Sequence, residues 1–96
     1  MPEKHHKLLV PREVAEVIRT LHPHIKKKVK ASLQIILSDP HSGKSLKNEL
    51  VGLKSFRVSK FRIIYRRGTG RIVELVAMGP RERIYEETYR LIRSGR

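Results

Sequence analysis

The sequence has no cysteine among its 96 residues. This absence excludes disulfide bonds, thiolate catalysis and cysteine-ligated zinc, so the stability of the fold has to come from packing. Long apolar runs are also missing. None approaches the roughly 20 residues that a membrane-spanning helix needs, and residues 1–10 lack the apolar stretch of a signal peptide. We therefore expect a cytoplasmic protein without membrane association.

Acidic residues are scarce as well. Only 9 Asp and Glu stand against 22 Lys and Arg, which gives a formal net charge of +13. Such a chain repels itself and attracts polyanions, so we expect a nucleic-acid partner, first of all RNA. The densest cationic segment runs from Lys54 to Arg67, holds no Asp or Glu, and contains Lys54, Arg57, Lys60, Arg62, Arg66 and Arg67. A merely solvated basic face is the alternative.

Hydrophobic residues make up 39% of the chain and recur in periodic runs, which predicts one packed domain over residues 1–96. Apolar residues at helical spacing predict helices over Arg12 to Leu21 and Pro23 to Leu37, separated by the helix-breaking pair His22-Pro23. With so short a connection, the two helices should lie antiparallel and pack their apolar stripes on a sheet.

The rest of the pattern predicts strands and one more helix. The strands are Lys7 to Val10, Phe56 to Ser59, Phe61 to Arg67 and Ile72 to Met78, with Gly68-Thr69-Gly70 as a hairpin turn and Leu46, Leu50 and Leu53 pinning the preceding loop. The final helix, Glu82 to Arg93, has Tyr85, Tyr89 and Ile92 as its apolar stripe. We therefore predict an α+β fold with a small antiparallel sheet, packed by the N-terminal helix pair, in the order β-α-α-β-β-β-α.

Most motifs that carry chemistry are absent. The five histidines lie near the N-terminus or in predicted turns, without metal-ligand spacing, and no G-x-S-x-G motif occurs. The Gly68-Thr69-Gly70 turn is not followed by a helix, which excludes a phosphate-binding loop. We expect neither a metal nor a cofactor.

Two arginine motifs remain, Phe61-Arg62-Ile63-Ile64-Tyr65 and Gly79-Pro80-Arg81-Glu82-Arg83-Ile84-Tyr85. Together with Leu50-Val51-Gly52-Leu53 and Arg57-Val58, they resemble the RelE/ParE superfamily of type II toxin-antitoxin toxins over nearly the whole chain. The resemblance implies a toxin that inhibits translation as a ribosome-dependent mRNA endoribonuclease (an mRNA interferase) and is held inactive by a cognate antitoxin. Its partners would be that antitoxin, the ribosome and mRNA.

The resemblance also implies roles for individual residues. Arg62 and Arg81 fall on the family's catalytic arginines, which hold the scissile phosphate, and Tyr85 falls on its C-terminal tyrosine. RNA supplies its own nucleophile, the 2′-hydroxyl, so the protein has only to position the backbone, assist proton transfer and stabilise the charged transition state. Guanidinium groups match phosphate geometry for this task. The candidates for binding the RNA backbone are Lys54, Arg57, Lys60 and Arg83.

Departures from the family pattern keep alternatives open. Pro80 stands where some members have a histidine, and Gly43-Lys44-Ser45 stands where others have a carboxylate. This leaves either catalysis by basic residues or no nuclease activity. ParE-like members share the fold and poison DNA gyrase, which is the main alternative; an RNA-binding protein without catalytic capacity is the third.

The site residues also have structural alternatives. The alternative for Arg62 is a charged side chain that only keeps one face of the sheet solvated. Arg81 and Arg83 flank Glu82 and are placed to form ion pairs at a helix start. Tyr85 belongs to the predicted stripe of the terminal helix, where packing alone accounts for it.

Overall fold

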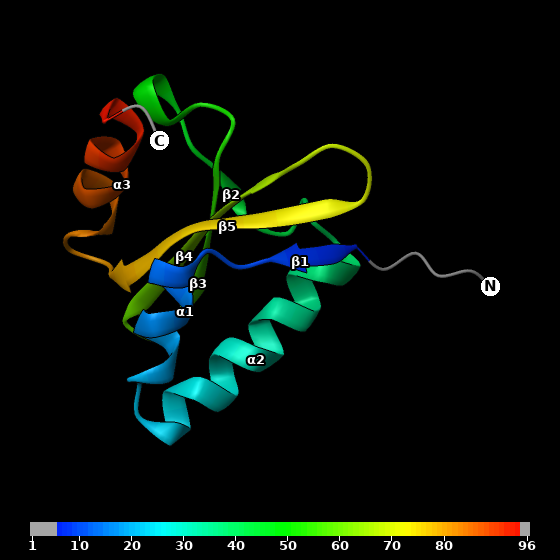
Figure 1. Ribbon diagram of the computed structural model, residues 1–96, viewed down its shortest axis with the longest axis vertical. Helices are drawn as coiled ribbons and strands as arrows, with labels where there is room; N and C mark the ends of the chain where they lie inside the picture. The colour runs from blue at the N-terminus through cyan, green and yellow to red at the C-terminus, as the bar shows by residue number, and fades with distance from the viewer. Residues whose placement is uncertain (1–5, 95–96) are drawn as a thin grey trace.

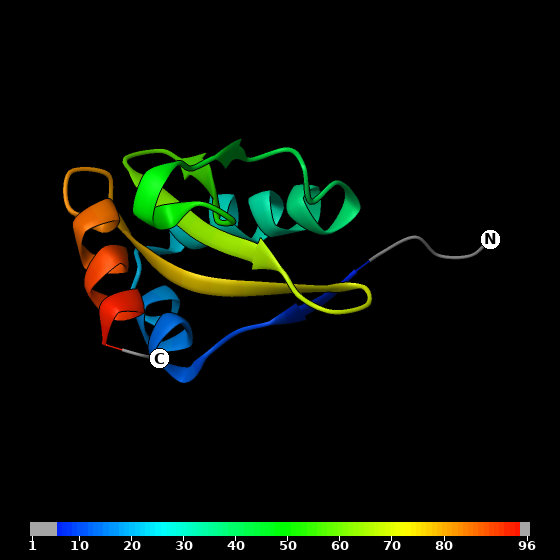
Figure 2. The same cartoon turned by 90° about the horizontal axis from the view of Figure 1, so that it is seen from above.

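The computed structural model describes residues 6–94. Its elements are β1 (Lys7–Leu9), α1 (Arg12–Arg19), α2 (Pro23–Ser38), β2 (Lys44–Ser45), the short 3-10 helix η1 (Asn48–Leu50), β3 (Lys54–Val58), β4 (Phe61–Arg67), β5 (Ile72–Pro80) and α3 (Ile84–Arg93). One sheet contains the strands in the order β1-β5-β4-β3-β2. Figures 1 and 2 show the α1-α2 hairpin and α3 packed around this twisted sheet. The predicted α+β class is confirmed.

The sheet is mixed, which differs from the wholly antiparallel sheet expected. β3, β4 and β5 form the predicted antiparallel meander. β1, however, runs parallel to β5, with Leu8 opposite Val73, and the two-residue strand β2 adds to the edge of β3. The alternation of apolar and polar residues identifies a strand but not the strand that it pairs with. The parallel pairing of β1 with β5 could therefore not be predicted from the sequence.

Several boundaries differ from the predicted ones. β3 begins at Lys54, β5 extends to Pro80, and α3 begins at Ile84. The β4-β5 ladder continues past the predicted end of β5 because Arg62 still pairs with Gly79 and Phe61 with Pro80. Proline is tolerated at this last position because its missing N–H is not needed there.

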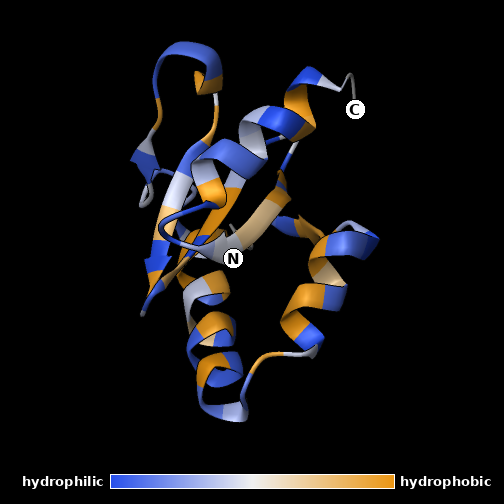
Figure 3. Ribbon diagram, turned by 90° about the vertical axis from the view of Figure 1, so that its left-hand side faces the viewer, coloured by the Kyte–Doolittle hydropathy of each residue, from blue (hydrophilic) through white to orange (hydrophobic). Residues whose placement is uncertain are grey.

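The α1-α2 hairpin covers one face of the sheet and forms the main core. Its buried members are Val14, Val29, Ile36, Val58, Ile63, Tyr65, Val73, Leu75 and Met78. Both helices have apolar and polar sides, as the hydropathy colouring in Figure 3 shows. His22 caps α2, since its Nδ1 accepts a hydrogen bond from the N–H of His24 at 3.1 Å.

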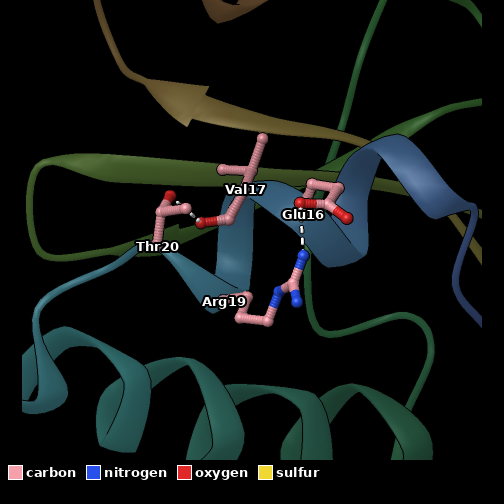
Figure 4. Close-up of polar contacts among 4 residues, drawn as sticks. All are labelled: Glu16, Val17, Arg19 and Thr20. Carbon is pink, nitrogen blue, oxygen red and sulfur yellow. Dashed lines mark hydrogen bonds and ion pairs between the residues drawn. The ribbon is translucent and has the colours of Figure 1, made fainter.

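α1 ends in local polar contacts. Arg19 Nη2 lies 2.6 Å from Glu16 Oε1, and Thr20 Oγ1 donates to the carbonyl of Val17 at 3.0 Å (Figure 4). Both side chains of the ion pair are exposed, so it contributes little to the stability of the helix.

α3 packs on the opposite face of the sheet over a smaller cluster of Leu53, Ile64, Ala77 and Ile84, with Leu46 and Leu50 packed against it as predicted. The predicted stripe of α3 is correct for Tyr85, which packs against this cluster, and wrong for Ile92. Ile84 and Thr88 are its buried residues, whereas Ile92 is 37% exposed. Ile84 packs closely against the end of β5, since a Cβ at Gly79 would lie only 3.2 Å from Ile84 Cδ1.

The loop before β2 is held by a buried phenol. Tyr65 Oη donates to the carbonyl of Pro40 at 2.9 Å and accepts from the N–H of Gly43 at 2.9 Å. A Cβ at Gly43 would lie 2.5 Å from this oxygen, so the close approach requires glycine.

No helix among residues 6–94 is long and apolar enough to cross a membrane.

The Tyr65 contact predicts a pH-dependent stability. Burial raises the pKa of the Tyr65 phenol above its ordinary value of 10.0. The stabilisation is therefore complete below the pKa of the unfolded chain and is lost as the pH rises through the folded-state pKa. At neutral pH, Tyr65→Phe should be less stable by about 1–3 kcal/mol because the Gly43 N–H and the Pro40 carbonyl lose their partner.

Above about pH 10 the free-energy difference between the two proteins should narrow, by at most about 1.4 kcal/mol per pH unit, because only the wild type has this phenol to ionise. Urea unfolding across the alkaline range measures the difference. A difference that does not change with pH would contradict this origin of the stability.

Candidate nucleic-acid interface

The candidate site lies on the α3 face of the meander. Arg57 is directly opposite Arg62 in the β3-β4 ladder, and Arg62 is opposite Gly79 in the β4-β5 ladder. Side chains of paired residues share a face, so both arginines project from the α3 side of the sheet; Arg57 Nε donates to the Ser59 carbonyl at 3.4 Å, while Arg62 extends toward Ser55. Gly79, which has no side chain, ends this row, and the side chain of Ile84 packs closely against it.

Arg62 is half-buried and joined to Tyr85 through one serine. Its Nη1 donates to Ser55 Oγ at 3.3 Å, and the same oxygen lies 3.1 Å from the phenol oxygen of Tyr85. The Nε of Arg62 is buried and has no hydrogen-bond partner within the described chain. The structure therefore brings together two of the three residues predicted to act in catalysis.

Two turns bring the other cations to the same end of the sheet. The N–H of Arg81 donates to the carbonyl of Lys60 at 3.0 Å, which ties the β5-α3 turn to the β3-β4 turn. Ser59 enables the β3-β4 turn with a left-handed φ of 59°. Arg57, Lys60, Arg81 and Arg83 are all exposed. We call these four residues together with Arg62 the basic end of the sheet.

The basic end of the sheet is not neutralised by acids. Within residues 6–94, the ion pairs seen are those of Arg19, Arg66 and Arg90, and none involves a residue of the basic end. Glu82 pairs with neither neighbouring arginine. Glu87 of α3 also lies near this surface, with Oε1 3.6 Å from the position of a Cβ on Gly79, but forms no ion pair there. Unpaired cations at one edge produce a positive field that attracts an anionic partner.

Lys54 is not brought together with Arg62. Because side chains alternate along a strand, Lys54 points to the other face of the sheet from Ser55, and there its Nζ donates to Ser45 Oγ at 2.8 Å. Lys44 lies opposite Ser55 in the β2-β3 ladder and so shares the α3 face. An open hollow of about 340 Å³ lies between Tyr85 of α3 and the segment that runs from β2 to η1. It is lined by Lys44, Ser45, Leu46, Lys47, Asn48, Leu50 and Tyr85.

Sequence reasoning missed Ser55 and Lys44. The signal for Ser55 was available, because it stands two residues before Arg57 on a strand and therefore shares its face. Lys44 had no such signal, since a two-residue strand shows no periodicity.

The arrangement suits an anion more than a metal. Arginine groups can form paired hydrogen bonds with a phosphate, and the adjacent phenol can donate or accept a proton. No group of three or more His, Asp or Glu side chains in the described part of the chain is placed to hold a metal ion.

Known proteins share this fold. Escherichia coli RelE carrying two arginine-to-alanine substitutions matches with a TM-score of 0.73 and 16% identity, over 96% of this chain and 99% of that one. A chain of the Mycobacterium tuberculosis toxin-antitoxin complex RelBE2 matches with a TM-score of 0.70 and 22% identity, over 80% and 92%. A chain of the archaeal RelE-RelB complex from Pyrococcus horikoshii gives 0.68 and 17%, over 82% and 98%.

The sequence comparison identifies the family. No curated protein matches the sequence significantly. Residues 10–85, however, match the family model of the ParE toxin of type II toxin-antitoxin systems. Since this match spans most of the chain and the fold agrees with that of RelE structures, the protein belongs to the ParE toxin family, within the RelE/ParE superfamily of type II toxin-antitoxin toxins.

Proposed function

We propose that this toxin is a ribosome-dependent mRNA endoribonuclease. The observation that supports it best is the half-buried Arg62, which has no carboxylate partner and is linked through Ser55 to the phenol of Tyr85. A guanidinium held in this way next to a proton-carrying hydroxyl suits phosphoryl transfer, in which negative charge develops on phosphate oxygens.

The reaction would use the RNA 2′-hydroxyl. Its oxygen forms a bond to phosphorus, the bond from phosphorus to the 5′-oxygen breaks, and a 2′,3′-cyclic phosphate and a 5′-hydroxyl result. The 2′-hydroxyl proton passes to water, and the Tyr85 phenol donates a proton to the leaving 5′-oxygen and regains one from water. Arg62 and Arg81 stabilise the charge on the phosphate oxygens in between.

An open site fits dependence on the ribosome. Arg57, Lys60, Arg81 and Arg83 are exposed at the basic end of the sheet, so the protein alone holds RNA mainly by its phosphates. Alignment of the 2′-oxygen with the 5′-oxygen has to come from elsewhere. A ribosome holding the mRNA in its decoding site supplies that alignment, in the cytoplasm.

Toeprinting in a purified translation system tests the proposal. Wild-type protein should produce truncated mRNA only when ribosomes are present, and Arg81→Ala should reduce the rate by about 10²-fold, as expected for loss of one transition-state hydrogen-bond donor. Arg90→Ala is the matched control, because Arg90 pairs with Glu86 on α3 outside the basic end. Absence of cleavage by wild type, or full activity of Arg81→Ala, would contradict the proposal.

A second candidate function is inhibition of DNA gyrase without nuclease activity. It is favoured by the match to the ParE family model and by the lack of a histidine or carboxylate at the two positions where RelE-like members have them. It predicts that purified toxin blocks supercoiling by gyrase and causes cleaved gyrase-DNA complexes to accumulate. Unchanged supercoiling would exclude it.

We also propose a cognate antitoxin as partner. Two of the three similar structures named above are toxin-antitoxin complexes, and the net charge of +13 favours an acidic antitoxin segment over the basic end of the sheet. Calorimetric titration with the product of an adjacent short reading frame should show tight binding that weakens in the double variant Arg57→Gln/Arg83→Gln. Equal binding by the two toxins would contradict this placement.

A further inference from the structure

Ser55 is a polar residue in an apolar setting. It lies on β3, is 2% exposed, and faces Ile64 across the β3-β4 ladder. Residues of the cluster beneath α3, including Leu53 and Ile64, adjoin it on this side of the sheet. A hydroxyl buried in such surroundings needs hydrogen-bond partners, because it has lost its water.

Its partners are the two residues proposed to act on RNA. Arg62 has only donors, so Ser55 Oγ accepts from Nη1 at 3.3 Å. The Tyr85 phenol, at 3.1 Å, either donates to Ser55 or accepts its proton. A serine hydroxyl has one proton and two lone pairs, so both contacts can be made at once.

Neither partner has a second side-chain anchor in the described part of the chain. Arg62 Nε is buried without a partner, and Nη1 makes its one side-chain hydrogen bond to Ser55. Tyr85 likewise has its one hydrogen bond from the phenol to Ser55. The position of the guanidinium relative to the phenol therefore depends on this single oxygen.

We infer that Ser55 is a positioning residue, which holds the Arg62 guanidinium and the Tyr85 phenol in the relative geometry that the reaction requires. This inference rests on the proposed nuclease function for its kinetic consequence, but its structural consequence can be measured without RNA. Ser55 itself does not contact substrate in this role.

The first test uses NMR on the free protein. In Ser55→Ala, the chemical shift of the Tyr85 ring carbon next to the phenol oxygen should change, and the guanidinium protons of Arg62 should exchange with water at least about fivefold faster, because both lose their shared partner. Ser32→Ala is the matched control: Ser32 is also a buried serine, but it donates to the carbonyl of Lys28 on the opposite side of the sheet. Its spectra should retain both wild-type properties.

The second test uses ribosome-dependent cleavage. Ser55→Ala should lower kcat about tenfold with little change in KM and should shift the pH-rate profile, whereas Ser55→Thr, which keeps a hydroxyl, should recover most of the rate. Ser32→Ala should retain the wild-type profile. If Ser55→Ala does not fold, Ser55→Cys, which keeps the size but bonds weakly, replaces it in both tests.

The two tests separate the inference from the proposed function. Wild-type protein that fails to cleave mRNA refutes the nuclease proposal, and the NMR result still decides whether Ser55 positions the pair. Unchanged Tyr85 and Arg62 signals in Ser55→Ala would overturn the inference. So would equal kinetic losses in Ser55→Ala and Ser32→Ala, or a Ser55→Thr variant as impaired as Ser55→Ala.

Discussion

Arg62→Met should greatly slow mRNA cleavage while leaving the domain as stable as the wild type or more so. The loss of rate should reach about 10²–10³-fold or more, because the substitution removes a charged donor from the developing phosphate charge. Methionine keeps much of the apolar stem of arginine and so preserves packing. Cleavage rates in the ribosome assay and thermal unfolding by circular dichroism measure the two effects.

The expected stability of Arg62→Met follows from the buried Nε of Arg62, which has no hydrogen-bond partner in the described chain. An unsatisfied buried donor costs about 1–3 kcal/mol, and the substitution also lowers the net charge. We expect the loss of the Ser55 contact to offset part of this gain, which leaves Tm unchanged or a few degrees higher. Arg66→Met, at an arginine paired with Glu74, is the control for charge removal and should retain activity.

A clear fall in Tm with activity retained would assign Arg62 a structural role in place of the proposed catalytic one. Arg62→Lys distinguishes charge from shape: it keeps the charge and loses the fork, so we expect it to recover little of the rate.

Ile84→Ala should release α3 from the sheet. Ile84 is 1% exposed and is one of only four buried members of the cluster under α3. Truncation of a buried isoleucine costs about 2–5 kcal/mol, and so small a cluster has few neighbours that can fill the cavity. The substitution also loosens Tyr85, the next residue, so activity should fall together with stability.

Hydrogen exchange locates this effect. Amides of α3 should exchange faster in Ile84→Ala, while those of α2, which pack in the main core on the other face, should remain protected relative to global unfolding. Leu91→Ala is the matched control, since Leu91 is 43% exposed on the same helix and should change stability by no more than about 0.5 kcal/mol. Equal acceleration in α2 and α3 would show that the domain unfolds as one unit.

Much of the fold was accessible from periodicity. The α1-α2 pair and the strands β4 and β5 were predicted because apolar residues recur at the spacing of each element over a long enough run. The strand β2 was missed, because it has only two residues and no pattern marks it. The stripe of α3 was only partly right: Tyr85 packs against the cluster under the helix, but the buried residues are Ile84 and Thr88, each one position earlier than Tyr85 and Tyr89. Helical spacing alone does not decide which side of the helix meets the sheet.

The candidate site divides in the same way. The sequence by itself determined the excess of positive charge and the placement of Arg62 on the other face of its strand from Ile63 and Tyr65. It also carried the resemblance that singled out Arg81 and Tyr85. These properties are local, because they depend on composition and on the two-residue repeat of a strand. Only the tertiary structure decided that Lys54 lies on the other face from Arg62, that Lys44 lies on the same face, and that Ser55 joins Arg62 to Tyr85. Those relations depend on strand register and on the docking of α3, which are contacts between residues far apart in the chain.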